Sequence, residues 1–198
     1  MPEMNPISRF FVNFSAARRA RRTLSWVRGA LTIGPGAECL EVGCGNGGFA
    51  VRFIDAFRPG RYVATDIDPH QIAVAGESVR RAAPSGPPPS LELRTADVLR
   101  LPFDDRSFDL AFAFLSIHHA SPTHHDFSQV PAALSELDRV LRPGARLVYQ
   151  EFLHREPIRR WLTDHGYAVE RVDRRWRIES VVARKPGPGA ATVAAVGS

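Results

Sequence analysis

The chain has 198 residues, 44% of them hydrophobic, and a formal net charge of +5. This length is enough for one domain with a full core. No run is long and apolar enough to span a membrane, and the first residues lack the apolar core and cleavage site of a secretory signal. Lys185 is the only lysine, so we interpret the high pI as a compositional bias towards arginine rather than as a sign of a nucleic-acid partner.

Residues 1–30 are predicted to be an N-terminal helical extension, with the helix over 7–30. Its apolar residues are partly spaced for one helix face: Ile7, Phe10, Phe11, Phe14, Leu24, Val27 and Leu31. Between them lies a basic run of Arg18, Arg19, Arg21 and Arg22. A solvated face is the favoured interpretation of this run, and contact with an anionic partner is the alternative.

Residues 38–57 predict a buried strand, a glycine turn and a helix. The apolar residues Cys39, Leu40 and Val42 are followed by glycines at 43, 45, 47 and 48, and apolar residues then recur at helical spacing. Glycines let the backbone turn tightly and let a ligand approach closely. The N-terminus of the following helix offers free N–H groups to an anion. The segment therefore predicts a nucleotide site.

The glycine spacing alone fits two kinds of nucleotide. Gly43, Gly45 and Gly48 satisfy the dinucleotide pattern G-x-G-x-x-G, and Gly43, Gly45 and Gly47 satisfy G-x-G-x-G. Glu41 favours the second, because a carboxylate suits an ammonium group, such as the amino acid end of S-adenosylmethionine, better than a pyrophosphate. The structural alternative is that Glu41 caps a turn and the glycines only shape a loop.

The two cysteines, Cys39 and Cys44, lie in this strand and this turn, and neither a disulfide nor a metal site is expected from them. Their use is typical of a reducing cytoplasm.

The rest of the chain alternates strands and helices until its end. Asp68 is placed to cap the helix that begins at Pro69. The remaining predicted elements are strands at 61–65, 90–95, 108–114, 145–151, 167–172 and 177–183, helices at 69–83, 131–141 and 157–165, a loop at 116–130, a helix stop at 142–144, and a disordered tail at 186–198.

Five strands separated by helices predict an α/β, doubly wound, mostly parallel sheet over residues 31–185. The closing pair has no helix between its strands, which brings the sheet to seven strands and makes the last one antiparallel. Ligands of such sheets bind at the carboxyl ends of the strands.

Two aspartates follow predicted strands. Asp66 lies 19 residues after Gly47 (66 − 47), which matches the spacing of an acid that binds ribose hydroxyls; a helix cap is the alternative. Asp97 is placed to accept a hydrogen bond from an exocyclic amine such as that of adenine, and Ile67 and the Val98 backbone are placed to flank the ring.

Four segments now carry a resemblance, in order: LEVGCGNGG (40–48), VATDIDP (63–69), TADVLRLPFDDRSFDLAFAF (95–114) and LSELDRVLRPGARLV (134–148). The chain resembles the class I S-adenosylmethionine-dependent methyltransferases of small molecules, which have a Rossmann-like fold. The resemblance implies S-adenosylmethionine as cofactor, held by Glu41, Gly43, Cys44, Gly45 and Gly47 at its methionine part, by Asp66 at the ribose, by Ile67, Asp97 and Val98 at adenine, and by Phe114 beside the passage to the acceptor.

The mechanism that follows is in-line displacement from a sulfonium, for which the protein mainly positions the reactants. His118 and His119 follow the fourth strand, and we expect one of them to orient or deprotonate the acceptor; a packing role is the alternative. A metal site at His124, His125 and Asp126 is conceivable, but no further ligand spacing supports it.

The chain departs from the family where residues 149–154 pass almost directly into the next helix. Family members often carry an insertion here that covers the substrate. The N-terminal helix, the 116–130 loop or a second subunit in a homodimer would have to supply that wall.

A small-molecule acceptor is therefore the leading interpretation. A protein acceptor also fits an open site. A nucleic-acid acceptor fits less well, because Phe114-Leu115-Ser116-Ile117 stands where DNA amino-methyltransferases carry Asn-Pro-Pro-aromatic. A nicotinamide-dependent reductase and a catalytically silent protein of the same fold are the remaining alternatives.

Overall fold

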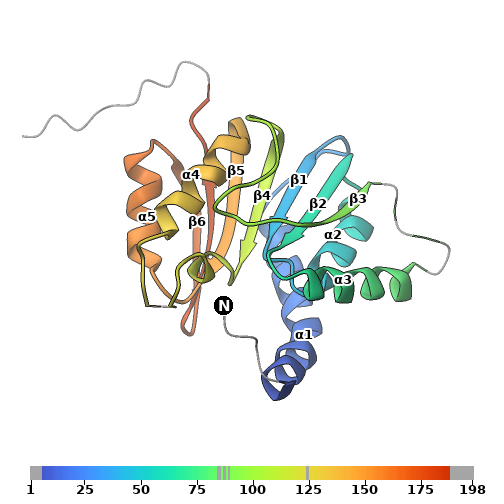
Figure 1. Ribbon diagram of the computed structural model, residues 1–198. Helices are drawn as coiled ribbons and strands as arrows, with labels where there is room; N and C mark the ends of the chain where they lie inside the picture. The colour runs from blue at the N-terminus through green and yellow to red at the C-terminus, as the bar shows by residue number, and fades with distance from the viewer. Residues whose placement is uncertain (1–5, 84–85, 87, 89, 124, 188–198) are drawn as a thin grey trace, which may run out of the picture. The chain divides into compact units, whose positions relative to one another are not determined.

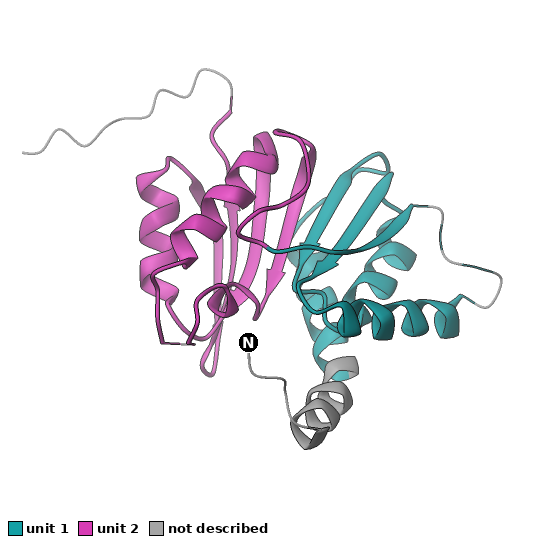
Figure 2. Cartoon of the chain, viewed as in Figure 1, with its two compact units in different colours: residues 1–97 teal, residues 98–198 magenta. Residues whose placement is uncertain are grey.

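The computed structural model describes residues 6–83, 86, 88, 90–123 and 125–187 (Figure 1). The chain divides into two compact units, Met1–Asp97 and Val98–Ser198 (Figure 2). The strands form a seven-stranded sheet in the order β3-β2-β1-β4-β5-β7-β6. The predicted fold class, a mostly parallel doubly wound sheet with an antiparallel last strand, is confirmed.

The first unit contains three parallel strands, with β1 paired to β2 and β2 to β3. Its elements are α1 (Pro6–Ala30), β1 (Glu38–Val42), α2 (Gly48–Phe57), β2 (Arg61–Asp66), α3 (Pro69–Ala82) and β3 (Leu91–Thr95). Leu40, Val63 and Phe53 are fully buried in its core. Both faces of β1 and β2 are covered, which explains why these strands have continuous apolar runs rather than an alternation.

Helix α1 packs against α2. Ala20, Thr23 and Val27 lie on its buried face. The basic run from Arg18 to Arg22 is exposed apart from Ala20, as a solvated face would be. The side chains expected on the apolar face at residues 7, 10, 11 and 14 lie outside the part that the structure describes.

The second unit contains four strands. Its elements are β4 (Phe108–Phe114), a 3-10 helix (Ile117–Ala120), α4 (Val130–Val140), β5 (Leu141–Glu151), α5 (Arg155–Asp164), β6 (Ala168–Arg175) and β7 (Ile178–Arg184). Strand β4 is parallel to β5, β7 is antiparallel to β5, and β6 is antiparallel to β7. Strands β6 and β7 therefore form the hairpin that the closing pair of predicted strands indicated.

The structure refines two local predictions in this unit. Helix α4 ends at Val140, next to the predicted stop at 142–144, but the stop residues themselves lie inside β5, which begins at Leu141 rather than at 145. Its pairing with β4 shifts register between Phe108 and Leu110. Pro143 has no N–H to donate and Gly144 has a φ of +81°, so these residues bulge out of the ladder. The predicted 116–130 loop also contains the 3-10 helix.

Most of the predicted tail, residues 188–198, lies outside the described part. Its first residue is held in place, because the carbonyl of Pro186 accepts a hydrogen bond from the Gly144 N–H at 3.2 Å.

Candidate functional site

The glycine turn after β1 is built from residues in left-handed conformations. Gly43, Gly45 and Gly47 have φ values of +69°, +53° and +69°, a region that side chains with a Cβ rarely occupy. The Cys44 N–H donates to the Thr65 carbonyl at 2.9 Å, and the Gly47 N–H donates to the Cys44 carbonyl at 3.0 Å. The turn is thereby fixed against the end of β2.

Asp66, the last residue of β2, binds this turn directly. Its Oδ2 accepts from the Gly45 N–H at 2.9 Å, and its Oδ1 accepts from the Asp68 N–H at 3.0 Å. Burial raises the pKa of the Asp66 carboxyl above its ordinary value, and the two backbone N–H groups oppose that rise. Each oxygen keeps a further lone pair, so the carboxylate can hold the turn and still accept from a ligand hydroxyl.

The two residues after Asp66, Ile67 and Asp68, have different surroundings. The Asp68 carboxylate accepts from the His70 N–H at 2.9 Å, so Asp68 is the N-cap of α3, as predicted, and Asp66 is not. Ile67 leaves 49% of its surface exposed beside the turn. An exposed isoleucine there suits a flat apolar ligand, and contact of Ile67 with adenine stays a prediction. Asp97 is half-buried at the end of this unit.

Glu41 points into the core of the unit. The Tyr62 hydroxyl donates to its Oε2 at 2.8 Å, and Glu41 is 3% exposed. Burial, with a smaller contribution from the Asp66 charge, raises the pKa of Glu41 to about 8, although the Tyr62 hydrogen bond lowers it. Near neutral pH the carboxyl is largely protonated, so binding of an ammonium group by Glu41 would require it to lose that proton.

Stability should therefore fall as pH rises. The folded-state pKa of Glu41, about 8, exceeds the ordinary 4.5, so the folded state holds the extra proton between these values. The free energy of unfolding should decline across that window with a slope approaching roughly 1.4 kcal/mol per pH unit. Glu41→Gln should remove most of this decline in urea unfolding at pH 5.5, 7 and 8.5. An unchanged slope in the variant would mean that other groups cause it.

Gly45→Ala and Gly47→Ala should show which glycine leaves room for the ligand and which is required for packing against α3. In both variants the alanine has to adopt a left-handed backbone conformation, which costs about 1–2 kcal/mol. A Cβ at Gly45 meets nothing within 4 Å, whereas one at Gly47 lies 3.0 Å from the Ala75 Cβ and 3.2 Å from its Cα. Gly47→Ala should lower the free energy of unfolding more. Gly45→Ala should mainly weaken nucleotide binding, by at least about tenfold. Urea unfolding and calorimetry check both; wild-type affinity in Gly45→Ala would show that the ligand does not use this space.

Both cysteines are free thiols and buried. Burial raises the pKa of Cys44 well above its ordinary value, with the charges of Glu41 and Asp66 adding to the rise. The thiol therefore contributes no charge to the turn, and it points towards the Gly45 carbonyl, 3.8 Å away.

The predicted residues of the second unit lie at and beyond the end of β4, except for Val98, which is half-buried near the start of the unit. Phe114 is half-buried, with its ring centroid 5.5 Å from that of Phe112. Leu115 follows with a φ of +56°, which is unusual for a side chain of this size. Its N–H donates to the Gln150 carbonyl at 2.8 Å. The chain thus turns sharply at the carboxyl end of β4, into the 3-10 helix that carries the histidines.

Glu151 holds that turn, and sequence reasoning missed it. Its Oε2 lies 2.7 Å from His118 Nδ1, and its Oε1 accepts from the N–H groups of Ile117 and His118 at 2.9 and 3.3 Å. Glu151 is fully buried and His118 is 2% exposed. A carboxylate that ends the apolar strand β5, as Asp66 ends β2, is the signal that could have identified it.

His119 differs from its neighbour in being exposed. The two imidazole centroids are 4.1 Å apart, and the centroids of the His118 and Phe152 rings are 4.9 Å apart in an edge-to-face arrangement. Of the two predicted histidines, His119 is therefore the one that a second molecule can reach, and His118 is part of the packed support.

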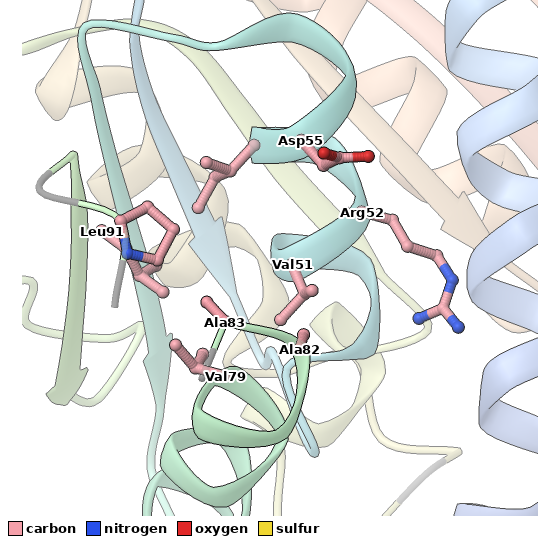
Figure 3. A pocket seen from close by; sticks show the side chains of 9 residues that line it. Val51, Arg52, Asp55, Val79, Ala82, Ala83 and Leu91 are labelled. Carbon is pink, nitrogen blue, oxygen red and sulfur yellow. The ribbon is translucent and has the colours of Figure 1, made fainter. Parts of the chain in front are cut away.

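A cavity of about 340 Å³ lies elsewhere in the first unit, between α2, α3 and the start of β3 (Figure 3). Its lining is Val51, Arg52, Ile54, Asp55, Val79, Ala82, Ala83, Pro88 and Leu91. Because Leu91 begins a parallel strand, the cavity lies at the amino ends of the strands, opposite to the edge where Asp66 ends β2.

Within the described residues, no three His, Cys, Asp or Glu side chains are grouped to hold a metal ion. His124, one of the histidines of the conceivable metal site, lies outside them. No helix in the described part of the chain has the length and apolarity to cross a membrane.

A model of the methyltransferase domain family matches residues 40–149. The fatty-acid O-methyltransferase of Mycolicibacterium smegmatis is 34% identical over 126 residues, which cover 64% of this chain and 41% of that enzyme. The chain spans less than half the length of the curated relatives it matches.

Two solved structures share the fold. A SAM-dependent methyltransferase from Aquifex aeolicus aligns with a TM-score of 0.70 and 19% identity, over 92% of this chain and 99% of that chain. The [4+2]-cyclase SpnF aligns with a TM-score of 0.69 and 19% identity, over 85% of this chain and 81% of that chain. These likenesses concern the fold alone, and the second shows that the fold also carries other chemistry.

Proposed function

The chain belongs to the methyltransferase domain family, and on that premise we propose that it transfers the methyl group of S-adenosylmethionine to an apolar small-molecule acceptor. The observation that carries the proposal is the bond between Asp66 and the Gly45 N–H, which joins the acid at the end of β2 to the glycine turn. We place the activity in the cytoplasm, because both cysteines are free thiols.

The residues present fit this cofactor. The position that a Cβ would take at Gly45 is open, and the exposed side chain of Ile67 lies next to Asp66 in the sequence. We assign the ribose hydroxyls to Asp66 and the adenine ring to Ile67, Asp97 and Val98. Gly43, Cys44, Gly45 and Gly47 would hold the methionine part by their backbone. Glu41 would take its ammonium group only after its buried carboxyl, which accepts from the Tyr62 hydroxyl, has lost its proton.

The chemistry that the cofactor supplies when bound is a methyl group already activated on a sulfonium, open to in-line displacement. The protein's own contribution is positioning. We assign His119 to the acceptor, as the group that orients it or removes its proton. His118 is a positioning residue, because Glu151 fixes its Nδ1 and the backbone beside it.

An apolar acceptor is supported by two features. One relative is named as a fatty-acid O-methyltransferase, and Phe152, which follows β5 directly, leaves 37% of its surface exposed. A protein acceptor and a homodimer remain alternatives that no residue of the described part specifically favours. A nucleic-acid acceptor is disfavoured, because the chain has no Asn-Pro-Pro-aromatic segment after β4. That α1 covers the substrate stays a prediction.

Two measurements test the proposal. Calorimetry with S-adenosylmethionine, S-adenosylhomocysteine and NADH should show binding of the two sulfur nucleotides and none of NADH. Release of S-adenosylhomocysteine should then depend on an acceptor drawn from long-chain carboxylic acids and phenols. Binding of NADH alone would support a reductase instead. Binding of the sulfur nucleotides without turnover would support a silent protein or another reaction, as in the cyclase that shares the fold.

His119 offers the second test. His119→Ala should lower kcat by about 10²–10³ if the imidazole acts as a base, with the affinity for S-adenosylhomocysteine unchanged. The pH profile of kcat should lose its lower limb. The exchange Ser116→Ala, three residues earlier in the segment after β4, serves as the control. Wild-type turnover in His119→Ala would remove the histidine from the mechanism.

A further inference from the structure

The tip of the β6–β7 hairpin carries the most exposed large apolar side chain of the described residues. Trp176 is 101% exposed and has a φ of +58°. It lies between Arg175 and Arg177, which are both exposed. A tryptophan normally buries a large apolar area, so an indole held entirely in water at a turn needs an explanation beyond the stability of the unit.

The positive charge of this hairpin is concentrated at its tip. Arg171 is paired with Asp173, and Arg174 with Glu179. Neither Arg175 nor Arg177 has a carboxylate within ion-pair distance in the part of the chain that the structure describes. The tip therefore presents one indole and two uncompensated guanidinium groups, on a protein whose net charge is +5.

The register of the sheet places this tip at the functional edge of the second unit. Glu179 of β7 pairs with Glu151, the last residue of β5, and Arg175 pairs with Ile178. The turn that carries Trp176 therefore extends past the carboxyl end of β5 (Figure 1). Glu151 supports the 3-10 helix of His118 and His119 at that same end.

We propose that the segment Arg175-Trp176-Arg177 docks this edge of the protein on an anionic lipid bilayer. Tryptophan favours the headgroup region, where its ring is partly apolar and its N–H stays hydrated. Arginine beside it is attracted to anionic lipids, and each such charge is worth about a fivefold gain in binding. The inference rests on the proposed function in taking the acceptor to be apolar, since such an acceptor would be concentrated in the bilayer.

A bilayer fits the tip better than the other occupants. A nucleic-acid backbone is usually held by a track of many Lys and Arg residues, and here the neighbouring arginines are already paired. A second copy of the chain would have to add to the outer strand β6. That strand is bulged between Val169 and Arg171 and rich in exposed charge, features that discourage pairing at an edge.

The test is sedimentation of the full chain with vesicles of phosphatidylglycerol or of phosphatidylcholine, without acceptor or cofactor. Binding should be confined to phosphatidylglycerol and should weaken as salt rises. Trp176→Ala should lower it at least about tenfold, and the double change Arg175→Ser/Arg177→Ser by about 25-fold. Urea unfolding of both variants should match that of the wild type, which shows that they fold.

The matched control is the change Arg18→Ser/Arg22→Ser, which removes two exposed arginines from α1 and should leave vesicle binding unchanged. Vesicle binding that survives the tip variants, or that is lost in the α1 variant instead, would overturn the proposal. Tip-dependent binding of duplex DNA or RNA with none to vesicles would also overturn it, as would a tip-dependent dimer in sedimentation velocity. Because no methyl transfer is measured, failure of the proposed function would leave these outcomes interpretable.

Discussion

Asp66→Asn is expected to weaken binding of S-adenosylmethionine and S-adenosylhomocysteine by at least about a hundredfold. Hydrogen bonds to a charged carboxylate are worth about 1.5–3 kcal/mol each, and the proposed site uses this group for the ribose hydroxyls. The variant also loses one of the two bonds to the N–H groups of Gly45 and Asp68, because an amide has only one oxygen. The free energy of unfolding should fall by only about 1–2 kcal/mol, so the fold persists.

Asp68→Asn is the matched control for charge. Asparagine caps a helix as well as aspartate does, so the bond to the His70 N–H is kept while a neighbouring negative charge is removed. Nucleotide affinity should change by less than about threefold. Equal losses in both variants would indicate that local charge, not the ribose contact, governs binding.

A modified ligand can show whether Asp66→Asn weakens binding by losing a ribose contact or by loosening the glycine turn. A 2′-deoxy analogue of S-adenosylhomocysteine should bind the wild type more weakly than the parent compound, yet bind Asp66→Asn about equally. If the analogue loses the same factor in both proteins, Asp66 does not contact the 2′-hydroxyl.

The sequence was sufficient where structure is determined locally. The apolar run and the glycines predicted β1, the turn and α2 to within about a residue, because strand period and left-handed turns have direct residue signatures. The Asp68-Pro69 pair predicted the start of α3, and its capping bond is present. Short connections between the closing strands predicted the hairpin.

The sequence was insufficient where the structure depends on partners that are distant in the chain. Glu41 lies in a strand buried on both faces, so alternation does not show which way its carboxyl points; the Tyr62 hydroxyl, on the next strand, decides it. Arg142-Pro143-Gly144 has the composition of a helix stop, and the same properties also suit a bulge in β5. Helix α4 does end at Val140, and whether residues 142–144 also belong to β5 depends on pairing with β4, which the composition does not show.

The histidine pair shows the same limit at the site. The two histidines are neighbours in the sequence, yet His118 is buried and His119 is exposed. The difference comes from Glu151, a partner 33 residues from His118 in the chain. The prediction that both follow β4 at the carboxyl edge is confirmed, whereas their separate roles could not be read from the sequence.

Glu151→Leu is expected to be the most destabilising single exchange in the second unit. The change leaves His118 Nδ1 and the N–H groups of Ile117 and His118 without their acceptor, in surroundings where Glu151 is fully buried. Breaking a buried pair in this way costs about 3–5 kcal/mol, a large part of the 5–15 kcal/mol typical of a domain. Urea unfolding measures this loss in the free energy of unfolding. Glu156→Gln, on the exposed start of α5, is the control.

Milder and coupled variants distinguish lost acceptors from lost volume. Glu151→Gln keeps the size and one carbonyl oxygen, so it should cost only about 1–2 kcal/mol. In Glu151→Leu/His118→Leu one of the stranded donors is also removed, so the double change should cost less than the sum of the single changes. Strict additivity would mean that the carboxylate serves only the backbone N–H groups. His118 would then be a packed neighbour of the turn rather than the group that Glu151 positions.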